Sequence, residues 1–266
     1  MEDAGAEAGA SGIKRGQSGK TGAEFRDVLC SQTLGWALTL RTRPYAIMPT
    51  VPPVEILRRQ PAPAVTPQAL AWHDGMLWIG SRDLRRVYRV DPKSWTVLEE
   101  IAAPGIPWAA VSTGDALWFT LGEGEEDDRY LHRFVPGTGF ARDERIACPD
   151  FTGSYLSFDG SNLYLSQWYQ HRILKLDDKG NILESIEVQE EICGHTCVDG
   201  KLYVLRGTEQ DGEQWRISRL DLQNGRGPIE DLATIPFQSR SLTFDGEQFW
   251  SNHRAADTTI AFTLPH

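Results

Sequence analysis

The segment QALAWHDGMLWIGS, residues 68–81, decides the fold because the chain contains four further copies of its pattern. Those copies are WAAVSTGDALWFTL from Trp108, SYLSFDGSNLYLSQ from Ser154, CGHTCVDGKLYVLR from Cys193 and RSLTFDGEQFWSNH from Arg240. Each copy has a short apolar stretch, a tight turn of the Asp-Gly type and a second stretch that opens with an apolar-aromatic pair. Such turns are typical of two-strand β-hairpins. We therefore predict five equivalent hairpins.

The apolar residue that opens each second strand recurs every 39 to 47 residues, at Leu77, Leu117, Leu163, Leu202 and Phe249. This period is typical of a four-stranded propeller blade. Five candidate third strands follow the hairpins, but only four candidate fourth strands do. The segment VEILRRQPAP, from Val54, matches the missing fourth strand. The sequence therefore predicts an all-β fold, a five-bladed β-propeller closed by its own N-terminal strand, which leaves no open sheet edge.

The first fifty residues differ in composition from the remainder of the 266-residue chain. Residues 1–47 are mostly rich in Gly, Ala and polar residues, which is typical of disorder. The stretch GQSGKT at Gly16–Thr21 has two residues between its glycines, whereas a phosphate-binding loop needs four and a strand before them. We therefore expect a leader or linker over residues 1–51 and the propeller over residues 52–266.

Composition excludes several classes of function. Acidic residues outnumber basic ones by 37 to 27, giving a net charge of −10, which argues against nucleic-acid binding. The sequence has no apolar run of 18 residues, so we expect no membrane span. It has four cysteines and no cleavable secretory pattern, which favours a cytoplasmic location. We further expect a monomer without a cofactor.

The candidate binding site is one mouth of the central channel, where first strands begin and second strands end. First strands begin with Gln68, Trp108, Ser154, Cys193 and Arg240, and second strands end with Ser81, Leu121, Gln167, Arg206 and His253. Convergent polar groups on an apolar wall are typical of a small-molecule site, and arginines favour an anionic ligand. The predicted ligand-binding residues are Gln68, Ser81, Trp108, Gln167, Arg206 and Arg240. The alternative is that these side chains only solvate a wet channel.

Two histidines are candidates for general-base catalysis, because the pKa of an unperturbed histidine lies near neutrality. His195 occupies a position that is apolar in the other four copies, and His253 ends the last second strand. The alternative for His195 is a core histidine whose ring is hydrogen-bonded. It alternates with Cys193 and Cys197, but these cysteines lie roughly 13 Å apart on an extended strand, too far to share an ion. We therefore predict no metal site, and we expect the acidic run Glu123–Asp128 to form a solvated hairpin tip.

The blade pattern, as in LAWHDGMLWIGSRDLRRVYRVDP, resembles the plant-type glutaminyl cyclase (glutamine cyclotransferase) family and the streptogramin lyase and NHL-like propellers. The stretch Thr66–Leu70, TPQAL, is similar to the Thr-Gln-Gly-Leu signature of the cyclases, which carry an acidic residue where this chain has Ile79. LWFTL, ending at Leu121, is similar to the LWFTE of the lyases. The catalytic motifs are thus not matched, and the resemblance implies the propeller fold.

Two functions are compatible with these observations. The first is a propeller that binds a small anionic molecule at the channel mouth, with lyase or cyclotransferase activity as a possible chemistry. The alternative is a non-catalytic scaffold for protein–protein interaction. A deep mouth holding His195, Arg206, Arg240 and His253 would favour the first function, and a shallow, plugged channel would favour the second.

Overall fold

A computed structural model describes residues 51–209, 214–222 and 227–265, apart from the side chains of residues 142 and 143. The prediction for residues 1–51 lies, except for its last position, outside the described residues. None of the described residues forms a helix long and apolar enough to cross a membrane.

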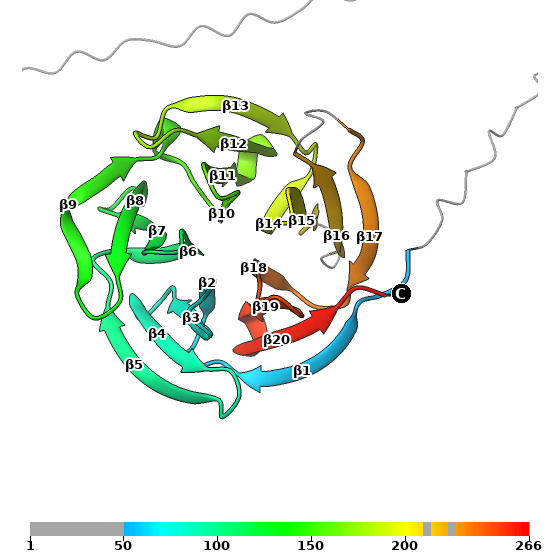
Figure 1. Ribbon diagram of the computed structural model, residues 1–266, viewed down its shortest axis with the longest axis horizontal. Coiled ribbons are helices and arrows are strands. Elements are labelled where there is room, and N and C mark those ends of the chain that lie inside the picture. Colours follow the sequence, from blue (N-terminus) through cyan, green and yellow to red (C-terminus); the bar gives the residue numbers. More distant parts are fainter. Residues whose placement is uncertain (1–50, 210–213, 223–226, 266) are drawn as a thin grey trace, which may run out of the picture. The chain divides into compact units, whose positions relative to one another are not determined.

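The described residues form twenty strands in five four-stranded antiparallel sheets, which surround a central axis (Figure 1). The first blade contains β2 (Pro67–His73), β3 (Met76–Ser81), β4 (Arg86–Asp91) and β5 (Thr96–Ala102). The second contains β6 (Ile106–Ser112), β7 (Leu117–Glu123), β8 (Asp128–Val135) and β9 (Gly139–Ala147). The third contains β10 (Leu156–Phe158), β11 (Leu163–Gln167), β12 (Arg172–Leu176) and β13 (Ile182–Glu187). The fourth contains β14 (Glu191–Val198), β15 (Lys201–Thr208), β16 (Gln214–Asp221) and β17 (Glu230–Ile235).

The fifth blade confirms the predicted closure. It contains β18 (Ser239–Phe244), β19 (Phe249–His253) and β20 (Thr258–Thr263), and its outer strand is β1 (Glu55–Pro61). β1 runs antiparallel to β20, with Glu55 opposite Thr263 and Pro61 opposite Thr258 (Figure 1). Just before β1, the amide of Val54 donates a hydrogen bond of 3.0 Å to the carbonyl oxygen of Thr234 in blade four. The N-terminal strand therefore links the last two blades.

Burial follows the distance of each strand from the axis. The inner strands β2 and β18 are buried at almost every residue, which explains why their sequences are nearly continuously apolar or small. The outer strand β13 is exposed along almost its whole length. Among the aromatic residues of the second strands, Trp78, Tyr164 and Trp250 are fully or almost fully buried, whereas Trp118 and Tyr203 are partly buried.

The hairpin turns form because their residues tolerate a left-handed backbone. In blade one, Asp74 and Gly75 have φ values of 48° and 74°, and in blade four Asp199 and Gly200 have values of 49° and 72°. Two consecutive positive φ values define the turn whose twist matches that of a two-strand hairpin, and Asp-Gly is a preferred pair for it. The hairpins of blades one and four thus have the predicted local cause, whereas in the turns of blades two, three and five only the glycine has a positive φ.

Connections between second and third strands bring side chains to the face where first strands begin. In blades three and five these connections are short 3-10 helices, η2 (Trp168–Gln170) and η3 (Arg254–Ala256). Each ends in a residue with left-handed backbone, His171 or Asp257. A further 3-10 helix, η1 (Pro149–Phe151), precedes blade three.

Candidate functional site

A cavity of about 210 Å³ lies at the mouth of the central channel, and all five blades contribute to its wall. The lining residues are Arg82, Trp108, Arg129, Ser154, Tyr155, Trp168, Tyr169, Glu209, Arg240 and Arg254. They lie near the starts of first strands or the ends of second strands, which is the face that the repeat predicted. Four of the ten are arginines, although the protein as a whole carries a net charge of −10.

Trp108 forms an aromatic wall on which arginine side chains pack. The guanidinium carbon of Arg129 lies 3.9 Å from the centre of the Trp108 ring, and that of Arg82 lies 6.0 Å from it. The indole nitrogen of Trp108 donates a hydrogen bond of 3.2 Å to Asp127, which also accepts one of 2.5 Å from Arg129. Burial lowers the pKa of Arg129, and the charge of Asp127 opposes that effect. Asp127 therefore holds both side chains in place.

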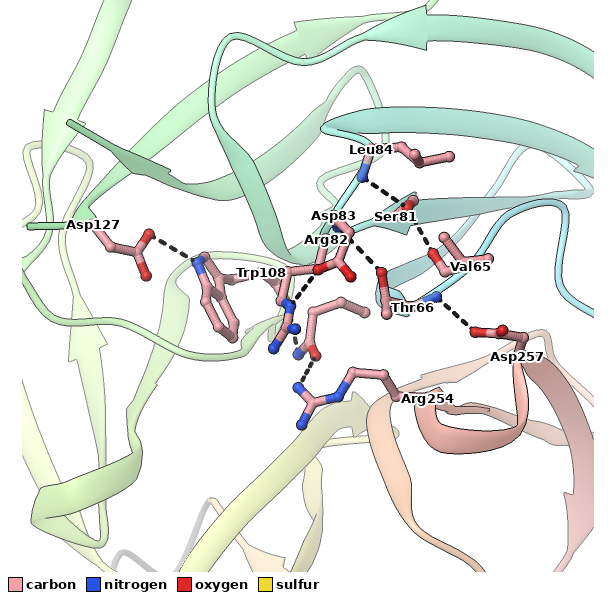
Figure 2. A network of polar contacts seen from close by, with 11 residues as sticks. Val65, Thr66, Ser81, Arg82, Asp83, Leu84, Trp108, Asp127, Arg254 and Asp257 are labelled. Atoms are coloured by element: carbon pink, nitrogen blue, oxygen red, sulfur yellow. Dashed lines mark hydrogen bonds and ion pairs between the residues drawn. The ribbon is translucent and has the colours of Figure 1, made fainter. Parts of the chain in front are cut away.

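Gln68 connects opposite sides of the cavity. Its amide nitrogen donates hydrogen bonds to the carbonyl oxygen of Trp108 at 3.3 Å and to the hydroxyl of Tyr155 at 3.2 Å. Its amide oxygen accepts a hydrogen bond of 2.9 Å from Arg254. Figure 2 shows the side chains of Arg82 and Arg254 directed toward the same space, with Trp108 beside them. Burial raises the pKa of Tyr155 to about 12, so this hydroxyl stays protonated.

Arg240 is the most buried charge of the cavity, with 3% of its surface exposed. Its guanidinium donates hydrogen bonds to the carboxylate of Glu209 and, at 2.7 Å, to the carbonyl oxygen of Ser239. It also lies 5.7 Å from the ring centre of Trp168 and 5.5 Å from that of Trp215. A buried guanidinium is tolerated when it is paired and stacked in this way.

Arg254 differs from the other three arginines. Arg82, Arg129 and Arg240 form ion pairs with Asp83, Asp127 and Glu209. Arg254 forms no ion pair with any carboxylate of the described residues. Its guanidinium donates a hydrogen bond to the neutral amide oxygen of Gln68. Burial lowers its pKa, and the nearby positive charge of Arg240 lowers it further.

A second hollow of about 410 Å³ adjoins the cavity and shares Arg129, Ser154, Trp168 and Tyr169 with it. Its other lining residues include four carboxylates, Glu126, Asp127, Asp128 and Asp150. The first three belong to the acidic run, whose turn joins β7 to β8 as predicted. Asp127 is not simply solvated, since it is bonded to Trp108 and Arg129.

Solved structures of similar shape were found, whereas no family model matches the sequence and no curated protein sequence is significantly similar. Glutaminyl cyclase from Myxococcus xanthus has a TM-score of 0.61 and 14% identity, with 80% of this chain and 98% of that chain covered. Regucalcin from Agrobacterium tumefaciens has a TM-score of 0.52 and 12% identity, with 82% and 96% covered. A streptogramin B lyase has a TM-score of 0.48 and 15% identity, with 77% and 67% covered.

The likenesses to glutaminyl cyclase and regucalcin show the fold. The first of them bears out the resemblance inferred from the blade pattern, and at this level of identity neither transfers an activity or substrate to the present chain.

Among the predicted ligand-binding residues, Trp108 and Arg240 line the cavity, and Gln68 bonds to three of its lining residues. Ser81 and Gln167 lie outside it. The Ser81 hydroxyl donates to the carbonyl oxygen of Val65 at 2.7 Å. The amide nitrogen of Gln167 donates hydrogen bonds to the carbonyl oxygen of Pro149 and to the hydroxyl of Thr152. Its amide oxygen accepts one from Arg172. Both residues fix the connections that carry the lining side chains.

The predicted convergence of Arg206 and His253 with Arg240 is not what the described residues show. β15 continues past Arg206 to Thr208, so Arg206 remains within the blade and does not reach the mouth. There its guanidinium pairs with Glu190 at 3.0 Å and Asp231 at 2.7 Å. The ring of His253 lies 5.9 Å from that of Phe237, and it is not among the lining residues.

His195 is fully buried, as its place in the repeat predicted. Its Nε2 donates to the carbonyl oxygen of Tyr155 at 3.1 Å, and its Nδ1 accepts from the hydroxyl of Ser157 at 2.7 Å. We assign these roles because a carbonyl oxygen can only accept. Desolvation lowers the pKa of His195 to about 3, so the ring is neutral at pH 7. Since both nitrogens are occupied, we assign His195 a structural role, joining blade three to blade four.

The described residues contain no group of three or more His, Cys, Asp or Glu side chains placed to hold a metal ion. Cys148 and Cys197 are free thiols.

Sequence reasoning missed Arg82, Arg129, Tyr155, Glu209 and Arg254. A signal for two of them was available. Arg82 and Arg254 directly follow the second strands of blades one and five, so the repeat read one position further would have indicated both. Arg129 and Glu209 had no such signal, because each belongs to a blade-specific connection or to the start of a third strand.

Proposed function

We propose that the protein binds a small anionic molecule at the mouth of its central channel. The observation that carries this proposal is Arg254, a half-buried guanidinium without a carboxylate partner among the described residues, in a cavity with three further arginines. Placing like charges together near a low-dielectric wall is unfavourable unless an anion joins them. A guanidinium also binds carboxylates and phosphates through two parallel hydrogen bonds.

Binding is a better-supported function than turnover by a lyase or cyclotransferase mechanism. Such reactions need a group in the cavity that accepts or donates a proton near pH 7. Glu209 is paired with Arg240, and burial raises the pKa of Tyr155 to about 12. His195 lies outside the cavity wall with both nitrogens occupied.

The test is a thermal unfolding screen with a panel of small anions, namely acetate, benzoate, citrate and phosphate. A ligand at one hundred times its Kd stabilises the native state by about 2.7 kcal/mol. For a domain of this size that corresponds to a rise in Tm of about 5–10 °C. Arg254→Ala should abolish the rise, and Arg86→Ala, a matched loss of an arginine on β4 outside the cavity, should preserve it.

If no anion of the panel raises the Tm, the binding proposal is wrong, and the scaffold alternative is the one to retain.

A further inference from the structure

The charges around the cavity leave a single positive charge unbalanced. Arg82 pairs with Asp83 at 3.0 Å, Arg129 pairs with Asp127 at 2.5 Å, and Arg240 pairs with Glu209. Arg254 is the fourth guanidinium and has no such partner among the described residues. One negative charge on a ligand would therefore balance the cavity.

A second negative charge would meet unfavourable surroundings. The lining of the cavity continues into the adjoining hollow, which shares Arg129 and Trp168 with it. Four carboxylates line that hollow, Glu126, Asp127, Asp128 and Asp150. Asp127 and Asp150 are paired with arginines, whereas Glu126 and Asp128 form no ion pair with the described residues. The unpaired carboxylates of this hollow repel a second negative charge on the ligand. A dianion or an extended polyanion is therefore disfavoured relative to a monoanion.

The remaining wall is aromatic. Trp108, Tyr155, Trp168 and Tyr169 contribute their rings to the lining. Tyr169 projects from η2 at the rim with 92% of its surface exposed, so a ligand in the mouth would cover an otherwise solvated ring. Arginine and aromatic surfaces together bind flat π systems, because rings stack on both.

The size of the cavity limits the ligand to about one ring. Its volume is about 210 Å³. An apolar cavity of roughly 150 Å³ in another protein accommodates benzene. The volume by which this cavity exceeds the benzene-binding one is enough for a carboxylate group. It is too small for a second ring, unless that ring projects over the rim.

We infer that the ligand is a monocarboxylate with a single aromatic ring, its carboxylate bound by Arg254 and its ring lying against the wall of Trp108, Trp168 and Tyr169. This inference rests on the proposed function, because it specifies the anion that the same cavity binds.

The test is calorimetric titration of the full-length protein with four probes, namely benzoate, benzamide, phthalate and acetate. Benzamide keeps the ring without the charge, phthalate adds a second carboxylate, and acetate lacks the ring. Benzoate should bind at least tenfold more tightly than each of the other three, which corresponds to about 1.4 kcal/mol or more. This comparison uses the unaltered chain, so it does not depend on the folding of any variant.

Variants then locate the two halves of the site. Arg254→Gln should weaken benzoate at least tenfold and change benzamide less than about twofold, because only the charge-dependent part of binding is lost. Tyr169→Ala should weaken benzoate and benzamide equally. Arg86→Gln, on β4 outside the cavity, should change neither.

Tighter binding of phthalate or acetate than of benzoate would overturn the inference while leaving the proposed function intact. Equal loss of benzoate and benzamide in Arg254→Gln would overturn it as well. Failure of all four probes, together with phosphate and citrate, would overturn both.

Discussion

Replacing His195 by Leu should remove a specific part of the pH dependence of stability. The folded state holds this ring neutral with a pKa of about 3, whereas the ordinary pKa of a histidine in an unfolded chain is 6.5. A folded pKa below the unfolded one means that the unfolded chain binds more protons as the pH falls. Stability is therefore full above pH 6.5 and is lost progressively between pH 6.5 and about 3.

The size of this loss follows from the gap between the two pKa values. Each pH unit below 6.5 costs about 1.4 kcal/mol, so the wild-type protein should lose about 2 kcal/mol from this group by pH 5.0. In His195→Leu the titrating group is absent. The variant also loses the hydrogen bonds to Ser157 and Tyr155, which should lower its stability at pH 7.5 by about 1–3 kcal/mol.

Urea unfolding of both proteins at pH 7.5, 6.5, 5.5 and 5.0 checks this prediction. The stability difference between wild type and His195→Leu should shrink by about 2 kcal/mol from pH 7.5 to 5.0. Carboxylates titrate in both proteins and cancel in the comparison. A constant difference across the pH range would refute the assignment of a buried, neutral His195.

Three further predictions concern the closure and packing of the blades. A chain beginning at Ala62 lacks β1 and the buried Val54, so its free energy of unfolding should fall by at least about 3 kcal/mol in urea titrations; unchanged stability would contradict closure by β1. A Cβ on Gly194 would lie 2.6 Å from the backbone of blade five, so Gly194→Ala should cost about 1–3 kcal/mol, whereas Gly227→Ala, with open space around it, should cost almost nothing. Burial raises the pKa of the thiols of Cys148 and Cys197 to about 12. Iodoacetamide at pH 8 should therefore modify them at least about a hundredfold more slowly in the folded than in the urea-unfolded protein. Equal rates of modification, followed by mass spectrometry, would show that these thiols are accessible.

Much of the fold could be predicted because each blade repeats the same local physics. The Asp-Gly turns and the apolar-aromatic pairs depend on neighbouring residues only, and the count of third and fourth strands then requires β1 to close the ring. The burial of His195 and its hydrogen bonds were predictable for the same reason, since a polar residue at an apolar position must find partners when it is buried. The pattern left its role open between a general base and a core histidine.

The site could be predicted less completely because it depends on the connections, in which the blades differ. Arg206 does not line the cavity because β15 runs two residues further than the repeat suggests, and its guanidinium pairs with Glu190 and Asp231. Arg254 was missed although the repeat read one position further would have indicated it, because its side chain reaches the cavity from η3, which follows β19 directly. Charge pairing also required the structure, because the sequence contains no indication that Arg240 is neutralised by Glu209 and Arg254 is not.

A crystal structure with 4-bromobenzoate tests anion binding at the channel mouth most directly, because anomalous scattering locates the bromine without ambiguity. We predict one dominant bromine peak against Trp168 and Tyr169, with the carboxylate in hydrogen-bond contact with Arg254. Data from Arg254→Gln crystals under the same conditions should lack that peak. A bromine site elsewhere on the propeller, or an equally strong peak at the mouth of the variant, would contradict the proposed anion site.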